Sequence, residues 1–321
     1  MPMETFLEFE KPIAELEGKI KELRHLSESG EMDITAEVSK LQSRADQLLT
    51  ETYGQLTAWQ KTLVARHLDR PHFTHYVQAL IEDFSPLAGD RAYGEDRAIQ
   101  GGPGRFRGRS VMVIGHEKGI GTDGRIAHNF GMAHPEGYRK ASRLLQMADR
   151  FNLPVLTLVD TQGAYPGVGA EQRGQAEAIA RTIEVGLDVR VPVVSVILGE
   201  GGSGGAVALA VGNKVLMLEH SIYSVISPEG CAAILWRSSD KAKEAAEALK
   251  LTAQDLLKLR VIDQIISEPT GGAQRHPQEM VKRVGAAIAQ AFDDLDALGE
   301  QADYRALRRK KFLDMGKVGL A

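Results

Sequence analysis

The segment VPVVSVILGEGGSGGAVALAV, residues 191–211, decides how this chain should fold. Its first eight residues are an apolar run without polar alternation, which is typical of a parallel strand buried on both faces. Five glycines follow among the seven residues Gly199–Gly205, and the next six residues, AVALAV, are apolar on every side. We therefore expect a buried strand over 191–198, a bare turn over 199–205 and a short buried helix over 204–211.

The same order of strand, turn and helix occurs on both sides of this segment. Runs rich in valine, isoleucine and leucine predict further buried strands, and a helical pattern follows each of them. The strands are expected at 110–115, 153–159 and 214–218, and the helices at 135–151, 169–187 and 228–237. Successive units of this kind imply right-handed crossovers and parallel strands, so the sequence predicts a layered α/β fold.

The two ends of the chain carry different patterns. Apolar residues at helical spacing predict a helical hairpin over residues 10–50, broken at 27–33. The glycine- and arginine-rich residues 101–108 indicate an irregular loop. The basic run Arg305–Lys311 suggests a solvated tail or helix face. We divide the chain into a hairpin, an α/β domain and a basic tail, at 1–50, 51–296 and 297–321.

Composition excludes several classes of protein. The chain has 321 residues, with 39 Lys and Arg against 43 Asp and Glu, and a net charge of −4 argues against a strongly basic nucleic-acid binder. The single cysteine excludes an intrachain disulfide, and without paired Cys and His at ligand spacing we expect no metal site. No run approaches the roughly 18 apolar residues of a membrane span. The opening MPMETFLEFE is acidic rather than signal-like, so we expect a cytoplasmic protein without membrane association.

The glycine cluster has more than one interpretation. Bare backbone can expose consecutive N–H groups, which stabilise a negative charge. The spacing of Gly199, Gly201 and Gly204 also matches the dinucleotide-binding pattern G-x-G-x-x-G, with Glu219 near the place of a ribose-binding acid. Against this alternative, the following helix is short and apolar, and the strand is the third of the series rather than the first.

A hydrolase is a further alternative. The residues Gly201, Ser203 and Gly205 match G-x-S-x-G, in which Ser203 would be the nucleophile. An acid such as Asp255 or Asp263 precedes His276, as the order of such a triad requires. Nothing in the sequence places that histidine near Ser203.

A second turn of small residues strengthens the anion-binding interpretation. The stretch DTQGAYPGVGAE, Asp160–Glu171, follows the strand before the glycine cluster. Because parallel neighbouring strands end at the same edge of a sheet, both turns should border one crevice. A third turn, SVISPEG, offers Ser227 as the cap of the next helix.

Four of these segments carry a resemblance to a known family. EGYRKASRLLQMADRF, DTQGAYPGVGAEQRGQAEAIAR, VILGEGGSGGAVALAVGNKV and YSVISPEGCAAILW closely resemble the alpha subunits of bacterial acetyl-coenzyme A carboxylase carboxyltransferases. The likeness extends over nearly the whole chain. It implies a crotonase-like fold for residues 51–296, a spiral of repeated ββα units, with the N-terminal hairpin attached.

The resemblance also implies an activity and its partners. The family moves a carboxyl group from carboxybiotin to acetyl-CoA and forms malonyl-CoA, the first committed step of fatty acid biosynthesis. The carboxybiotin would be carried on the biotin carboxyl carrier protein, with no cofactor bound covalently to this chain. A carboxyltransferase beta subunit would complete the active site in an α2β2 assembly, with biotin carboxylase in the larger complex.

This chemistry needs oriented donors for developing oxyanions more than it needs a side-chain base. We expect the backbone N–H groups of Gly204 and Gly205 to form one oxyanion hole. The candidate substrate-binding residues are those that shape its approach, Gly201 and Gly202, those that line the crevice, Gly163, Tyr165, Pro166 and Gly167, and two that could contact phosphate, Arg139 and Lys140.

Overall fold

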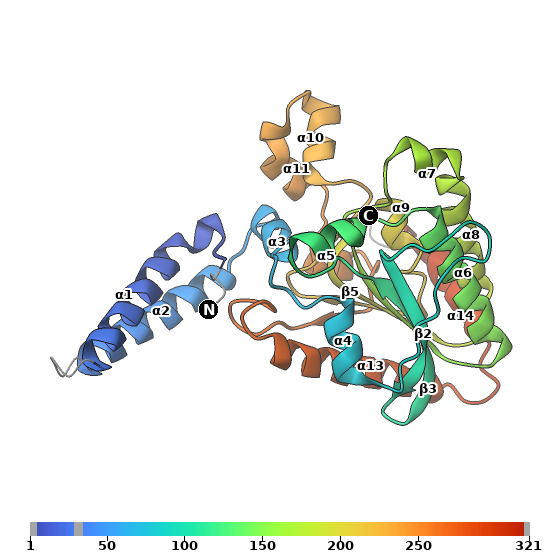
Figure 1. The fold of residues 1–321 in the computed structure, drawn as a ribbon, viewed down its shortest axis with the longest axis horizontal. Coiled ribbons are helices and arrows are strands. Elements are labelled where there is room, and N and C mark those ends of the chain that lie inside the picture. Colours follow the sequence, from blue (N-terminus) through green and yellow to red (C-terminus); the bar gives the residue numbers. More distant parts are fainter. Residues whose placement is uncertain (1–4, 29–34, 318–321) are drawn as a thin grey trace.

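The computed structural model describes residues 5–28 and 35–317 (Figure 1). One eight-stranded sheet forms the centre, in the order β1-β2-β3-β4-β5-β6-β8, with β7 paired to the far end of β5. The pairs from β3 onward are parallel, as the sequence predicts, whereas β1, β2 and β3 pair antiparallel. The strands are β1 Ile81–Glu82, β2 Ile99–Phe106, β3 Arg109–His116, β4 Val155–Thr161, β5 Val193–Gly202, β6 Lys214–Leu218, β7 Ile222–Ser224 and β8 Gln264–Ile266.

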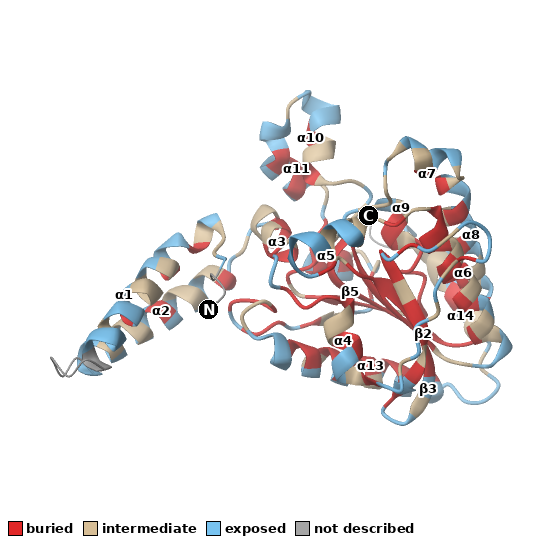
Figure 2. Cartoon of the chain, in the orientation of Figure 1, coloured by how far each residue is buried: buried red, intermediate tan, exposed pale blue. Residues whose placement is uncertain are grey.

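Helices cover both faces of this sheet, which explains why its central strands are apolar throughout. Alternate residues of β4 face opposite layers, so that Val155 and Val159 pack in one core and Leu156 and Leu158 in the other. The first core lies against α6 (Pro135–Arg150) and α8 (Gln175–Asp188), and the second against α4 (Phe73–Leu80) and α13 (Pro277–Asp296). Figure 2 shows the buried residues concentrated in this sheet.

The predicted irregular loop at 101–108 is wrong, because most of it is the strand β2. The glycines of this strand allow other segments to approach its backbone closely and do not form a turn. A Cβ atom at Gly102 would lie 1.9 Å from the carbonyl oxygen of Ser85, and one at Gly101 would lie 2.7 Å from Cδ1 of Leu144. A glycine-rich strand is therefore required here, although glycine normally disfavours strands.

The N-terminal hairpin is present. Its helices α1 (Lys11–Glu28) and α2 (Thr35–Tyr53) pack on each other and extend away from the sheet (Figure 1). The predicted break at 27–33 lies mostly outside the described residues. The predicted helix over 169–187 is divided at Gly174, which has a φ of +81°. The other helices are α3 Ala58–Ala65, α5 Gly121–Ala127, α7 Val168–Gln172, α9 Ser203–Val207, α10 Pro228–Trp236, α11 Ala242–Ala248, α12 Ala253–Lys258 and α14 Tyr304–Asp314.

The basic C-terminal segment differs from the predicted solvated tail. It forms α14, and Arg308 within it is fully buried. The Arg308 guanidinium donates hydrogen bonds to the carbonyl oxygens of Val189 and Val191 and to Oδ1 of Asn213. This helix is thus anchored to the loop before β5. None of the described helices is both long enough and apolar enough to cross a membrane.

Candidate functional site

Strand β5 runs further into the glycine cluster than the sequence predicts. It ends at Gly202 rather than at Leu198, since Glu200, Gly201 and Gly202 pair with β7. The chain turns at Ser203, whose φ of +53° is unusual for a residue with a side chain. Helix α9 begins at Ser203 itself. It has five residues and is shorter than the predicted 204–211. The bare turn is consequently confined to 202–205.

This turn packs backbone against backbone on the second predicted turn. A Cβ atom at Gly202 would lie 2.1 Å from the carbonyl oxygen of Gln162. One at Gly205 would lie 2.8 Å from the amide nitrogen of Ala164 and 2.7 Å from the hydroxyl of Tyr138. The glycines at 202 and 205 are therefore needed for contact, and the structure brings the two turns together as expected.

The amide groups of the glycine turn differ in their surroundings. Ser203, Gly204 and Gly205 begin α9, where the N–H groups have no partner within the helix. The backbone of Gly205 lies near the His116 ring and acts to raise its pKa, as a carbonyl oxygen does when it faces a ring N–H, although neither ring nitrogen makes a full hydrogen bond. Burial is the larger effect and lowers the pKa of His116 to about 4, so this ring is neutral at pH 7.

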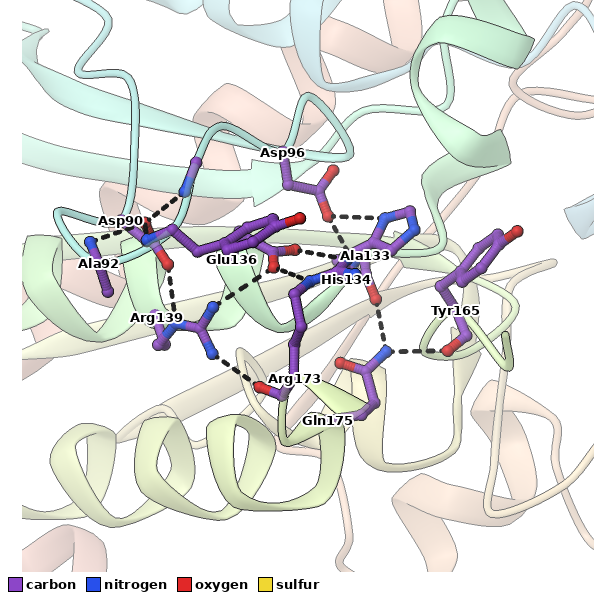
Figure 3. Close-up of polar contacts among 12 residues, drawn as sticks. Asp90, Ala92, Asp96, Ala133, His134, Glu136, Arg139, Tyr165, Arg173 and Gln175 are labelled. Carbon is purple, nitrogen blue, oxygen red and sulfur yellow. Dashed lines mark hydrogen bonds and ion pairs between the residues drawn. The ribbon is translucent and has the colours of Figure 1, made fainter. Parts of the chain in front are cut away.

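The second turn is fixed to the start of α6. The Tyr165 N–H donates to the carbonyl oxygen of Ala133 at 3.0 Å. The side-chain amide of Gln175 donates to the carbonyl oxygens of both of these residues at 2.9 Å (Figure 3). The Tyr165 ring stacks on His134 with 4.1 Å between centroids. Pro166 is exposed at the tip of this turn, whose conformation is set by these contacts.

Gly163 and Gly167 belong to the same turn. The Gly163 N–H donates to the hydroxyl of Thr161 at 3.1 Å, and the Gly163 φ of +150° lies in a region that favours glycine. A Cβ atom at Gly167 would lie 2.3 Å from the Tyr165 ring. Both glycines are therefore required by local geometry, whatever their contact with a substrate.

The structure gives Arg139 and Lys140 partners inside the chain. Nε of Arg139 lies 2.7 Å from Oδ2 of Asp90 (Figure 3). Lys140 is buried, and its ammonium group donates to the carbonyl oxygen of Asp96 at 2.8 Å and pairs with Glu95. Both side chains therefore make ion pairs within the chain.

One cluster near α6 has the composition of a metal site. The possible ligand atoms of Asp96, His134 and Glu136 lie within 4.8 Å of one another. However, the Glu136 carboxylate already pairs with the guanidinium groups of Arg139 and Arg173 (Figure 3). The Asp96 carboxylate accepts the backbone N–H groups of Ala98 and His134. These carboxylates are committed to donors of the chain itself.

Sequence analysis missed a charged cavity beside the glycine turn. A cavity of about 450 Å³ is lined by Arg66, Leu68, Lys118, Phe130, Gln162 and Glu200, among others. A smaller cavity, which shares Arg66, Gln162 and Glu200 with it, reaches Gly201 and Gly202. The lining residues come from distant parts of the chain, and no local motif marks them.

The hydrolase triad is not assembled. Ser203 is exposed at a sharp turn, as a nucleophile would be. The Asp255 carboxylate instead accepts from the hydroxyl of Thr252, and Asp263 accepts from the Val215 N–H. His276 lines a separate cavity between the N-terminal hairpin and the rest of the chain.

The structure also argues against the dinucleotide-binding alternative. Its first two glycines lie within strand β5 rather than in a turn. The Glu219 carboxylate accepts the backbone N–H of Glu268.

Comparison with known proteins identifies the family of the chain. Residues 6–316 match the family described as acetyl co-enzyme A carboxylase carboxyltransferase-like. The chain is 67% identical to the acetyl-coenzyme A carboxylase carboxyl transferase subunit alpha of Paramagnetospirillum magneticum, over 98% of this chain and 99% of that protein. The corresponding subunit of Rhodospirillum centenum is 64% identical, with the same coverage.

Solved structures share the fold at low sequence identity. Transcarboxylase 12S superposes with a TM-score of 0.60 at 18% identity, covering 74% of this chain and 43% of that one. A Pseudomonas malonate decarboxylase hetero-tetramer in complex with coenzyme A gives 0.58 at 16% identity, covering 73% and 90%. The crotonase-like α/β fold expected from the sequence is thereby confirmed. By the family match and by identity over almost its full length, the chain belongs to the alpha subunits of acetyl-coenzyme A carboxylase carboxyltransferase.

Proposed function

We propose that this chain is the alpha half of a biotin-dependent carboxyltransferase, which forms malonyl-CoA from acetyl-CoA in the cytoplasm as the first committed step of fatty acid biosynthesis. Carboxybiotin supplies the carboxyl group, and the ring nitrogen that is freed when CO2 leaves can accept a proton from the acetyl methyl group. The observation that carries the proposal is the glycine turn 202–205, packed on a second bare turn and opening beside a charged cavity.

The main task of this chain is to hold donors where negative charge develops. The Gly204 N–H stands at the start of α9 and would donate to such an oxygen. The Gly205 N–H follows at the same helix start and would be a second donor. In other enzymes the loss of one such donor costs about 2.7–4 kcal/mol of transition-state stabilisation.

The larger cavity fits the chemistry of the carboxyl donor. Leu68 and Phe130 offer apolar surface for a ring system, and the paired charges of Arg66, Lys118 and Glu200 lie on the same cavity wall. The second turn, Gly163–Gly167, would form the opposite side of the crevice. Arg139 and Lys140 are already paired, so a phosphate contact would require them to exchange partners.

A beta subunit is the partner that the alpha-subunit family implies. The segment that follows β7 and helix α10 expose large apolar side chains, with Val225 77% exposed, Ile234 72% and Leu235 64%. Helix α10 stands away from the sheet in Figures 1 and 2. Because an exposed cluster of this kind favours association, we propose that the beta subunit docks in an α2β2 assembly, with biotin carboxyl carrier protein and biotin carboxylase joining it.

The test uses the chain purified together with its beta subunit. We expect the pair to form acetyl-CoA from malonyl-CoA in the presence of free biotin, which is the reverse reaction. The alpha chain alone should be inactive. A stable pair that transfers no carboxyl group would contradict the proposal.

A further inference from the structure

A chain of alternating charges lies beneath the glycine turn. Lys118 Nζ is 2.8 Å from Oδ1 of Asp160 and 3.1 Å from Oε1 of Glu200. The other oxygen of Glu200 is 2.7 Å from Nε of Arg66, whose Nη1 is 2.6 Å from Oε1 of Glu229. These five residues, the ion-pair chain, link parts of the fold that are remote in sequence.

The ion-pair chain fixes the end of strand β5 through both its backbone and a side chain. The Glu200 N–H donates to Oδ1 of Asp160 at 2.9 Å. A Cβ atom at Gly199 would lie 2.6 Å from the same carboxylate oxygen, so Asp160 is in close contact with the strand. The Glu200 side chain is held by Lys118 and Arg66, and Glu200 lies three residues before Ser203, where the amides of the turn begin. Any displacement of Glu200 would therefore move the turn.

Arg66 connects this strand to helix α10. It lies directly after α3, whereas Glu229 is in the first turn of α10 and Glu200 is in β5. A guanidinium group can bind two carboxylates at once because its donors form a rigid fork, which the single ammonium of lysine does not provide. Arg66 thus sets the distance between α10 and the end of β5.

Stability alone does not account for this arrangement. Burying paired charges costs desolvation energy, and apolar side chains of similar size often stabilise a fold as well or better. The side chains of Asp160 and Glu200 are 3% and 8% exposed, and that of Arg66 is 27% exposed on the wall of both cavities. The ion-pair chain lies next to the amides of Ser203–Gly205, and the rate of carboxyl transfer would depend on the direction in which these amides point.

We propose that Arg66 is a positioning residue, which bridges Glu200 and Glu229 and thereby directs the amides of Ser203–Gly205 into the crevice. This inference rests on the proposed carboxyl transfer. It also gives the exposed helix α10 a role, because whatever holds α10 in place would steady the glycine turn through the Arg66 bridge.

The test compares Arg66→Met and Arg66→Lys in the complex with the beta subunit, using malonyl-CoA and free biotin. Since misplacement by about 1 Å can cost roughly 100-fold in rate, we expect Arg66→Met to lower kcat at least about 10-fold. The KM for malonyl-CoA should stay unchanged, while the melting temperature should fall somewhat, because Glu200 and Glu229 each lose a partner. Arg66→Lys should recover part of kcat, since lysine can pair with one of the two carboxylates.

Two further variants make the result decisive. Glu229→Gln removes the α10 end of the bridge and should lower kcat without a further loss in the double variant with Arg66→Met. Arg190→Met is the matched control, because Arg190 pairs with Asp149 at an exposed site, and it should leave kcat unchanged. Should Arg66→Met fail to assemble, Glu229→Gln alone decides the inference.

The outcomes separate this inference from the proposed function. An unchanged kcat in both Arg66→Met and Glu229→Gln, or a kcat that returns to the wild-type value when the assay is run well below the melting temperature of the variant, would overturn the positioning role and leave carboxyl transfer intact. An inactive wild-type complex would overturn both.

Discussion

At the scale of single residues, the site depends on what glycine permits. At 202 and 205 a side chain would overlap another backbone segment or the Tyr138 hydroxyl. The sequence could predict that these glycines matter, because their density in one turn is unusual. It could not predict their contacts, since these join residues that are 40 to 67 positions apart.

The first prediction concerns the substitution Gly205→Val. Its side chain would push against Ala164 and Tyr138, so the amides of the turn should move. We expect carboxyl transfer to fall roughly 100-fold or more. Ser203→Ala should retain most activity, whereas a serine hydrolase would lose it. Gly18→Ala, at a glycine with open space around it, serves as the control in the same assay.

A second prediction follows from the buried imidazole of His116. Its folded pKa of about 4 lies below the ordinary value of 6.5. The unfolded chain therefore takes up a proton first as the pH falls from 6.5 towards 4, and the folded state loses stability over this window. Melting temperatures between pH 7 and 4.5 should fall less steeply in His116→Gln than in the wild type. A slope should remain, because burial also lowers the pKa of His220. Identical slopes in the two proteins would contradict the assignment.

At the scale of elements, the pattern of apolar residues located the parallel strands and the hairpin. A strand buried on both faces is apolar throughout, and a helix buried on one face has apolar residues at helical spacing. It failed at β2, where the requirement for close packing gives a strand the composition of a loop. It also failed at α14, whose basic residues looked solvated although one of them is buried.

The third prediction concerns the anchoring of helix α14 through Arg308. Replacing Arg308 with alanine leaves the carbonyl oxygens of Val189 and Val191 without their donor. An unsatisfied buried group costs about 1–3 kcal/mol, so Arg308→Ala should lower the free energy of unfolding by at least that amount. Chemical denaturation measures it, and Arg309→Ala, at an exposed neighbour, should change little. Equal effects of the two substitutions would show that α14 is not anchored through Arg308.

At the scale of the whole molecule, the sequence led to the fold and the family, whereas the ion-pair chain became visible only in the structure. Arg66 and Glu200 are 134 residues apart, and Arg66 and Glu229 are 163 apart. No spacing rule links such pairs. The same is true of the neighbouring turns, whose contact was predictable only because both follow adjacent parallel strands.

The proposed catalysis depends on where the backbone N–H groups of residues 203–205 point when the carboxyl donor is bound. A structure of the complex with the beta subunit and biotin tests this directly. We expect the ureido oxygen of biotin to lie about 3 Å from the amide nitrogen of Gly204 or Gly205, within hydrogen-bonding distance. If that oxygen is bound elsewhere, out of reach of the amides of residues 203–205, the oxyanion-hole assignment is wrong.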